Sequence, residues 1–170
     1  MTVADARELF AYNAWANRRF FAALAALPAD PYLRDLKSSH GGIHGTLCHL
    51  VWAEALWLNR WLARPNPAVA QGRDLATLEA ARAPWEALEA ERTALLADFD
   101  PARLDDTIEV HPSTGGAYRH TFGQMFRHAI DHSTYHRGQL VTLLRQVGAT
   151  PPSTGLIVFY RERGAAATPK

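Results

Sequence analysis

The chain has 170 residues, of which 48% are hydrophobic and 21% are charged, as in an ordinary soluble globular protein. Lysine and arginine together number 18 and the acidic residues 17, so there is no strong net charge to attract nucleic acid or an anionic membrane. We therefore expect one domain over residues 1–170, with neither nucleic acid nor a membrane as a partner.

Four segments have apolar residues at spacings of three and four, the pattern of helices. The first spans about residues 4–27 and ends at Pro28. Its apolar stripe contains two asparagines, Asn13 and Asn17. Buried amides of this kind are either hydrogen-bonded core groups or supports of a polar pocket, and the sequence leaves both interpretations open.

The second predicted helix, residues 43–63, is apolar on nearly all sides and therefore belongs inside a bundle. His49 should be at least partly buried on it, and Cys48 should be a small buried hydrophobic group. Glu54 is an isolated acid in this helix. It could accept a hydrogen bond from a ligand imidazole, serve as a general base, or pair with an arginine of another helix.

The third predicted helix covers about residues 74–99 and contains Pro84, where we expect a kink or a break into two helices. Residues 100–120 have no helical pattern. In that segment β-forming residues flank a turn of Pro, Ser, Thr and Gly at residues 112–116, which predicts a short β-hairpin or an extended loop.

The fourth predicted helix begins at Thr121, which has a capping-box signature with Gln124, and ends at Val147, with Gly148 as its left-handed cap. An apolar tail at residues 155–163 should pack back on the domain. Four helices with three connections predict an all-α fold, a four-helix bundle with the hairpin or extended loop between helices three and four.

The sequence has no feature of a secreted or membrane-spanning protein. Residues 1–20 lack the charged start, apolar core and cleavage site of a signal peptide, and no run of eighteen apolar residues occurs. Cys48 is the only cysteine, so no intrachain disulfide can form. We expect a cytoplasmic protein.

The chain carries eight histidines, and three of them, His128, His132 and His136, are evenly spaced in the fourth helix. His132 and His136 share one helix face with a rise of about 6 Å, so their imidazoles can converge on one cation. His128 lies about 12 Å along the axis from His136, too far to bind the same ion. A third ligand must come from another helix, and His49 is the buried candidate.

Three neutral imidazoles suit Zn²⁺, Ni²⁺ or Fe²⁺ and leave a coordination position for water or substrate, so that a bound water or thiol is activated. His128 would then support the site or pack beside it. The remaining histidines are expected to be solvated in or near loops, with His44 close enough to line a pocket mouth: His40, His44, His111 and His120. A metal-free bundle is the competing interpretation, because two histidines four apart do not by themselves establish a site.

Three strings, YNAWANRR in the first helix, IHGTLCHLVWAEALWLNRW in the second and HAIDHSTYHRGQL in the fourth, make the chain resemble the DinB-like (damage-inducible, YfiT-type) metalloenzymes over nearly its whole length. The resemblance implies a four-helix bundle with rearranged connectivity, a divalent metal held by His49, His132 and His136, and a homodimer. Relatives include thiol-dependent transferases and isomerases. Many relatives have an acidic residue where this chain has Gly155, so no role carries over to that position.

We therefore expect a metal-dependent enzyme, a thiol-dependent S-transferase-like protein or a hydrolase, that acts on a small electrophilic substrate with a low-molecular-weight thiol as candidate partner. No catalytic residue can be assigned, and Glu54 and Asn13 are the weak candidates. The alternative is a non-catalytic, stress-associated, dimeric metal-binding protein. An open coordination position beside a pocket favours the enzyme, and a closed four-ligand site favours the alternative.

Overall fold

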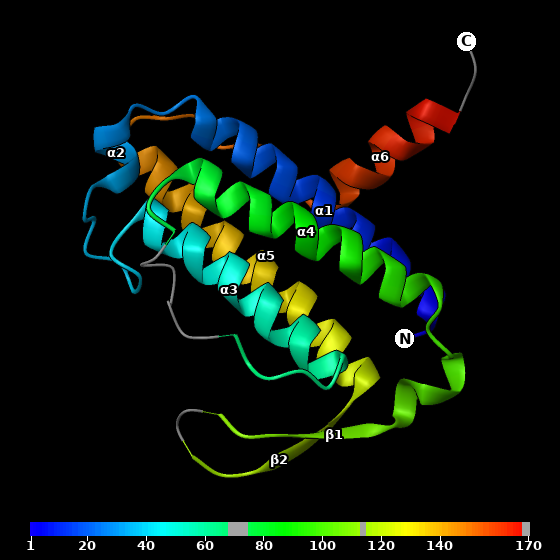
Figure 1. The fold of residues 1–170 in the computed structure, drawn as a ribbon. Coiled ribbons are helices and arrows are strands. Elements are labelled where there is room, and N and C mark those ends of the chain that lie inside the picture. The colour runs from blue at the N-terminus through cyan, green and yellow to red at the C-terminus, as the bar shows by residue number, and fades with distance from the viewer. Residues whose placement is uncertain (68–74, 113–114, 168–170) are drawn as a thin grey trace.

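The computed structural model describes residues 1–67, 75–112 and 115–167, most of which are helical. The elements in chain order are α1 (Val3–Ala25), α2 (Ala29–Leu33), α3 (Ile43–Trp61), α4 (Leu78–Ala97), the 3₁₀ helix η1 (Pro101–Asp105), β1 (Thr107–Val110), β2 (Tyr118–Thr121), α5 (Phe122–Gln146) and α6 (Leu156–Ala167). The four long helices predicted from the sequence are α1, α3, α4 and α5 (Figure 1), and their bounds agree with the prediction to within a few residues.

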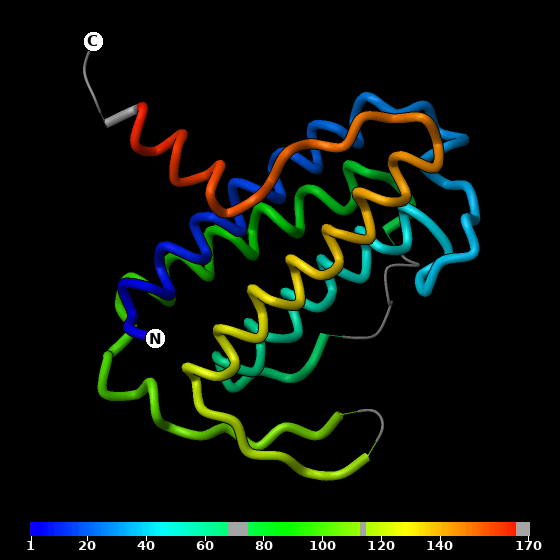
Figure 2. The backbone as a smooth tube through the Cα atoms, turned by 180° about the vertical axis from the view of Figure 1, so that it is seen from behind, coloured from blue at the N-terminus to red at the C-terminus, as the bar shows by residue number. Residues whose placement is uncertain are grey.

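The long helices form a four-helix bundle in which α1 and α3, consecutive in the chain, are not neighbours. α1 packs against α4 and α5, and α3 packs against the same two helices. α1 and α3 therefore occupy one diagonal of the bundle, and α4 and α5 the other (Figure 1, Figure 2). α1 and α5 run in one direction and α3 and α4 in the opposite one (Figure 1). The prediction of an all-α bundle with rearranged connectivity is confirmed.

Local sequence signals start and stop α5 where expected. The Thr121 hydroxyl accepts a hydrogen bond from the Gln124 N–H at 3.1 Å, and the Gln124 side chain accepts one from the Thr121 N–H at 3.0 Å. This capping box satisfies two amides that the helix itself leaves free. Gly148 follows the helix with φ of +78°, the left-handed conformation in which glycine has no steric penalty.

Of the two outcomes predicted at Pro84, a kink or a break, the structure excludes the break. The helix continues through Pro84 from Leu78 to Ala97, so the break that the sequence allows there does not occur. Residue 74, the predicted start of this helix, lies outside the described residues. The first turn is instead capped by Thr77, whose hydroxyl accepts a hydrogen bond from the Ala80 N–H at 3.1 Å.

The connection from α4 to α5 contains the predicted β-hairpin. β1 and β2 pair antiparallel, with Ile108 opposite His120. Residues 113 and 114 of the predicted turn lie outside the described residues. The hairpin lies at the end of the bundle where α5 begins (Figure 1), away from the middle of the helices.

The C-terminal tail, predicted only as an apolar segment packed on the domain, forms the helix α6 and leaves the bundle at an angle (Figure 1). Phe159 is its buried anchor and packs on the rings of Tyr12 and Trp15 in α1. In the described part of the chain, no helix is both long enough and apolar enough to cross a membrane.

The bundle interior has two apolar clusters with a polar layer between them. One cluster is rich in aromatic rings and includes Phe10, Trp61, Phe99, Phe122 and Phe126. The other includes Phe20, Phe21, Leu24, Ile43, Trp85, Leu140 and Leu144. Each fully buried side chain of this size contributes about 1.5–3 kcal/mol to folding, so these clusters hold the helices together. The polar layer consists of Asn13, Asn17, Glu54, Arg92, Ser133 and Arg137.

Candidate metal centre

The packing of α3 against α5 brings three imidazoles together. Nε2 of His49 lies 3.3 Å from Nε2 of His132 and 3.1 Å from Nε2 of His136. The Nε2 atoms of His132 and His136, one helical turn apart on α5, are also 3.1 Å apart. Three nitrogen atoms thus converge on one point. Two come from α5, and the third comes from His49 on α3, which precedes His132 by 83 positions and His136 by 87.

The donor set fits a divalent metal ion. Two nitrogen ligands at about 2.0–2.1 Å from one tetrahedral Zn²⁺ are about 3.3 Å apart, close to the spacing of the three Nε2 atoms. Nδ1 of His136 lies 2.8 Å from the side-chain oxygen of Gln139 and donates its proton there, so Nε2 of His136 keeps a free lone pair. Each Nε2 atom can either donate or accept one hydrogen bond, so hydrogen bonds cannot account for all three contacts among these atoms. A cation at the centre can bind all three nitrogens at once.

The environment keeps these imidazoles neutral, which is the form that binds metals. Burial, followed by repulsion from His40, His136 and His132, lowers the pKa of His49 to about 3. Burial, followed by repulsion from His136 and His128, lowers the pKa of His132 to about 4. Burial likewise lowers the pKa of His136. Near neutral pH each nitrogen that faces the convergence point is therefore available as a ligand.

His128, the first histidine of the run, is not one of the histidines whose Nε2 atoms meet. It is exposed, and its ring packs edge-on against Trp57 with the ring centroids 4.9 Å apart. Its ring centroid lies 5.7 Å from that of His132. The position agrees with the helical geometry, which separates His128 from His136 by two turns.

His40 lies at the site, although the sequence predicts a solvated loop residue. Its ring stacks on that of His49, with centroids 4.1 Å apart and an interplanar angle of 16°. One nitrogen each of His40, His49 and His136 lies within 4.8 Å of the other two. This second group is looser than the three converging Nε2 atoms. The Nε2 atoms of His49, His132 and His136, 3.1–3.3 Å apart, have the closer spacing of the two groups.

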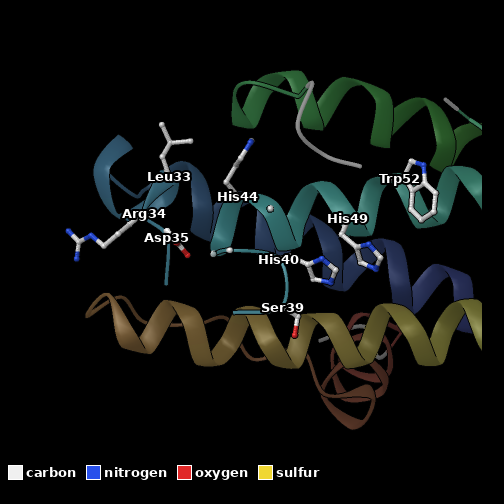
Figure 3. Close-up of a pocket in the computed structure, with 11 residues that line it drawn as sticks. Leu33, Arg34, Asp35, Ser39, His40, His44, His49 and Trp52 are labelled. Carbon is white, nitrogen blue, oxygen red and sulfur yellow. The ribbon is translucent and has the colours of Figure 1, made fainter. Parts of the chain in front are cut away.

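A cavity of about 530 Å³, a volume within the range of small-molecule sites, opens beside His49, whereas His132 and His136 are not among the residues that line it in the described part of the chain. Its lining includes His40, His49 and Trp52 near the centre and Leu33, Arg34 and Asp35 farther away (Figure 3). Figure 3 shows the rings of His40 and His49 pointing toward α5, while His44 points away from it. Two walls of the cavity therefore come from α3 and from the loop before it.

The other predicted histidines and the cysteine lie away from the centre. His44 lines the same cavity, as the sequence suggests, and its Nδ1 lies 3.1 Å from the Tyr32 hydroxyl. His111 is exposed beside Glu109, as expected. Cys48 is fully buried, and burial raises the pKa of its thiol to about 12, so the side chain remains a neutral thiol. The prediction that it is a small buried group is confirmed.

Glu54 is buried in the polar layer, and both of its oxygens are occupied. Oε1 accepts hydrogen bonds from the amide groups of Asn13 and Asn17 at 2.8 and 2.9 Å and from the Ser133 hydroxyl at 3.1 Å. Oε2 accepts one from Arg92 at 2.9 Å. Burial opposes ionisation of Glu54, but Arg92 and the amide donors hold its pKa below the usual value. Of the roles that the sequence left open, the arginine partner is the one observed.

Arg137 connects the histidine helix to α1. Its guanidinium donates to the side-chain oxygens of both Asn13 and Asn17, the latter at 3.0 Å. The two asparagines are therefore hydrogen-bonded core groups, the first of their two interpretations. Because Arg137 follows His136 directly in the chain, this buried network fixes the part of α5 that carries the imidazoles.

Two residues beside the three converging Nε2 atoms, Gln139 and His40, were not predicted from the sequence to lie at the site. Gln139 follows His136 by three positions, a spacing that places two side chains on one helix face, so a signal for it exists. His40 has no such signal, because the spacing between a loop residue and a helix is not periodic. Only the glycines that follow it, Gly41 and Gly42, indicate an unusual loop.

Comparison with known proteins gives one consistent result. A family model described as the DinB family matches residues 1–164. Protein DinB of Bacillus subtilis (strain 168) is 26% identical over 159 residues, which cover 89% of this chain and 92% of that protein. The crystal structure of a DinB-like protein from Bacillus cereus has a TM-score of 0.64 at 16% identity, covering 82% of this chain and 91% of that one. At so low an identity the structural likeness supports the fold alone.

Proposed function

The chain belongs to the DinB family, and from that premise we propose that it is a divalent-metal-dependent enzyme with His49, His132 and His136 as the ligands. One observation carries the proposal. The three Nε2 atoms lie 3.1–3.3 Å apart beside a cavity of about 530 Å³. Zn²⁺, Ni²⁺ and Fe²⁺ are the ions that such a set of neutral imidazoles suits.

The proposed reaction adds a thiol or water to a small electrophilic substrate, as an S-transferase or a hydrolase does. When bound, a divalent ion supplies Lewis acidity that lowers the pKa of a thiol or water. The chain's own residues keep the site ready for it: burial holds His49 and His132 neutral, and Gln139 holds the proton of His136 on Nδ1. The adjoining cavity is large enough for a small substrate and a low-molecular-weight thiol.

We assign a supporting role to Glu54 and Asn13, the weak catalytic candidates. Both are buried in the polar layer and bonded to each other, and neither is among the residues that line the cavity in the described chain. Their contribution is to hold α1, α3 and α5 in register, so that imidazoles from two helices meet within ligand distance.

The second candidate function is a non-catalytic, stress-associated and dimeric metal-binding protein. The observation that favours it is the position of His40, whose nitrogen lies within 4.8 Å of those of His49 and His136. A fourth protein ligand held permanently at the ion would leave no position for substrate, and the site would then be structural.

A turnover screen separates the two functions. Protein loaded with Zn²⁺, Ni²⁺ or Fe²⁺ is incubated with a panel of electrophiles and several low-molecular-weight thiols, and product is detected by mass spectrometry. Chelator-treated protein and His132→Ala are the controls. Product that requires both the metal and His132 supports the enzyme. Stoichiometric metal with no metal-dependent product in any combination puts the binding protein ahead.

A further inference from the structure

His40 reaches the centre from a loop, whereas the three converging histidines are carried by helices. The loop connects α2 to α3, and His40 is half-buried at its end. Its nitrogen lies within 4.8 Å of nitrogens of His49 and His136, while the helix-borne Nε2 atoms are 3.1–3.3 Å apart. A small movement of the His40 ring would therefore bring its nitrogen as close to those of His49 and His136 as ligands of one ion are to each other.

The loop is built to approach α3 closely at this point. A Cβ atom added to Gly45 would lie 1.9 Å from the His40 carbonyl oxygen, and one added to Gly42 would lie 2.3 Å from the Arg34 carbonyl oxygen. Gly41 has φ of +81°, a conformation that favours glycine. Gly45 therefore lets the His40 backbone lie directly against the first turn of α3, and Gly41 and Gly42 let the preceding loop turn there.

The His40 ring has no other polar attachment in the described part of the chain. Its contacts are the stacked ring of His49 and the tilted ring of His136, whose centroid is 5.3 Å away. It also lines the cavity (Figure 3), so a ligand entering that space meets it. An imidazole whose nitrogens have no hydrogen-bond partner among the described residues thus faces both the centre and the cavity.

We propose that His40 is an exchangeable fourth ligand of the ion held by His49, His132 and His136. With the ion bound, His40 completes its coordination until a thiol, or a water that enters with the substrate, takes its place, and His40 then returns to the stacked position beside His49. In the exchange the bond from the His40 nitrogen to the ion breaks, and a bond from the incoming sulfur or oxygen forms. The proton of an incoming thiol passes to solvent. The inference rests on the proposed function and adds a means of controlling access to the metal.

The test separates the donor nitrogen of His40 from the stacking of its ring. His40→Phe keeps a ring over His49 but has no nitrogen, and His40→Ala removes both. His44→Ala is the matched control, because His44 lines the same cavity but points away from α5 (Figure 3). Each protein is measured for Zn²⁺ affinity by chelator competition, and its Co²⁺ form is titrated with azide and followed by visible absorption.

Loss of a competing internal ligand should let azide bind more tightly, because the ion no longer has to be released by His40 first. We expect azide to bind His40→Phe and His40→Ala about tenfold more tightly than wild type, a factor that corresponds to His40 occupying the position in about nine tenths of the wild-type molecules. The same variants should hold Zn²⁺ about tenfold more weakly. His44→Ala should match wild type in both measurements.

The azide titration decides the outcome. An azide affinity of His40→Phe equal to that of wild type overturns the proposal, whatever the Zn²⁺ affinity. A change in His40→Ala that His40→Phe does not share also overturns it, because stacking on His49 is then the role of His40. Failure of wild type to bind Zn²⁺ or Co²⁺ at all would instead refute the proposed function, so the two failures are distinguishable.

Discussion

Gln139 and His136 form a hydrogen bond on one face of α5, with the Gln139 side-chain oxygen 2.8 Å from Nδ1 of His136. Because an amide oxygen only accepts, the contact places the proton on Nδ1 and leaves Nε2 to face His49 and His132. One turn of helix thus supplies both a donor atom and the group that orients it.

Gln139→Leu should weaken Zn²⁺ binding about tenfold without unfolding the protein, because outer partners of ligand histidines typically contribute tenfold to a hundredfold in affinity. Chelator competition measures the change. Gln139→Glu is the matched control, since a carboxylate also accepts the Nδ1 proton and should preserve the affinity. Equal affinities for the leucine variant and wild type would show that Gln139 does not orient His136.

The buried pair between Glu54 and Arg92 should matter far more for folding than any surface pair. Arg92→Met leaves the Glu54 carboxylate without its positive partner, which should cost about 3–5 kcal/mol in the free energy of unfolding. Arg64→Met removes an exposed pair with Glu91 and should cost at most about 1 kcal/mol. Urea denaturation of both variants gives the comparison. Similar losses in the two would contradict the role of the polar layer.

The metal-free protein should lose stability as the pH falls from about 6.5 toward 4, because two histidines resist protonation in the fold. The pKa of His49 is lowered from 6.5 to about 3, and that of His132 to about 4. The unfolded chain therefore binds protons first in this range. The stability that the neutral imidazoles of His49 and His132 contribute is complete above pH 6.5. It is lost as the pH falls toward the pKa values that these groups have in the folded protein.

His49→Asn should reduce this pH dependence, since one of the resisting imidazoles is gone. Urea midpoints of chelator-treated wild type and His49→Asn at pH 7.5 and pH 5 provide the measurement. A fall in midpoint of the same size in both proteins would mean that His49 is not held neutral by the fold.

Gly45 and Gly138 should respond in opposite ways to alanine. A Cβ on Gly45 meets the His40 carbonyl oxygen at 1.9 Å, so Gly45→Ala must displace the loop and should destabilise the fold by about 1–3 kcal/mol. Gly138 is exposed within α5 with nothing within 4 Å of an added Cβ, so Gly138→Ala should stabilise by about 1 kcal/mol. Thermal or urea unfolding checks both signs. A neutral Gly45→Ala would show that the loop contact is not tight.

The sequence predicted the four long helices well because each carries its own periodic apolar pattern, and α1, α4 and α5 also have N-terminal caps. It also predicted that His49 would meet His132 and His136, since helix geometry excluded His128 and burial selected His49. That the three bind a metal remains a prediction. The sequence could not decide between a kink and a break at Pro84; the helix stays continuous because its packing on α1 and α3 outweighs the hydrogen bond that proline lacks.

Some residues have positions that could not be predicted from the sequence, because contacts between distant segments determine them. His40 lies at the centre because of the conformation of a glycine-rich loop, which no local pattern specifies. Arg92 and Arg137 are almost fully buried, although arginine is usually exposed, because the amides and the carboxylate that they need come from other helices. Such a layer becomes visible only when four helices are placed together.

Zinc content after reconstitution tests most directly whether His49, His132 and His136 bind one ion. Each protein is stripped with chelator, loaded with Zn²⁺, desalted, and measured by elemental analysis, with circular dichroism to confirm folding. Wild type and His128→Ala should retain stoichiometric zinc, whereas His49→Ala and His132→Ala should lose it. Wild type without zinc, or His132→Ala with a full equivalent, would contradict the proposed centre.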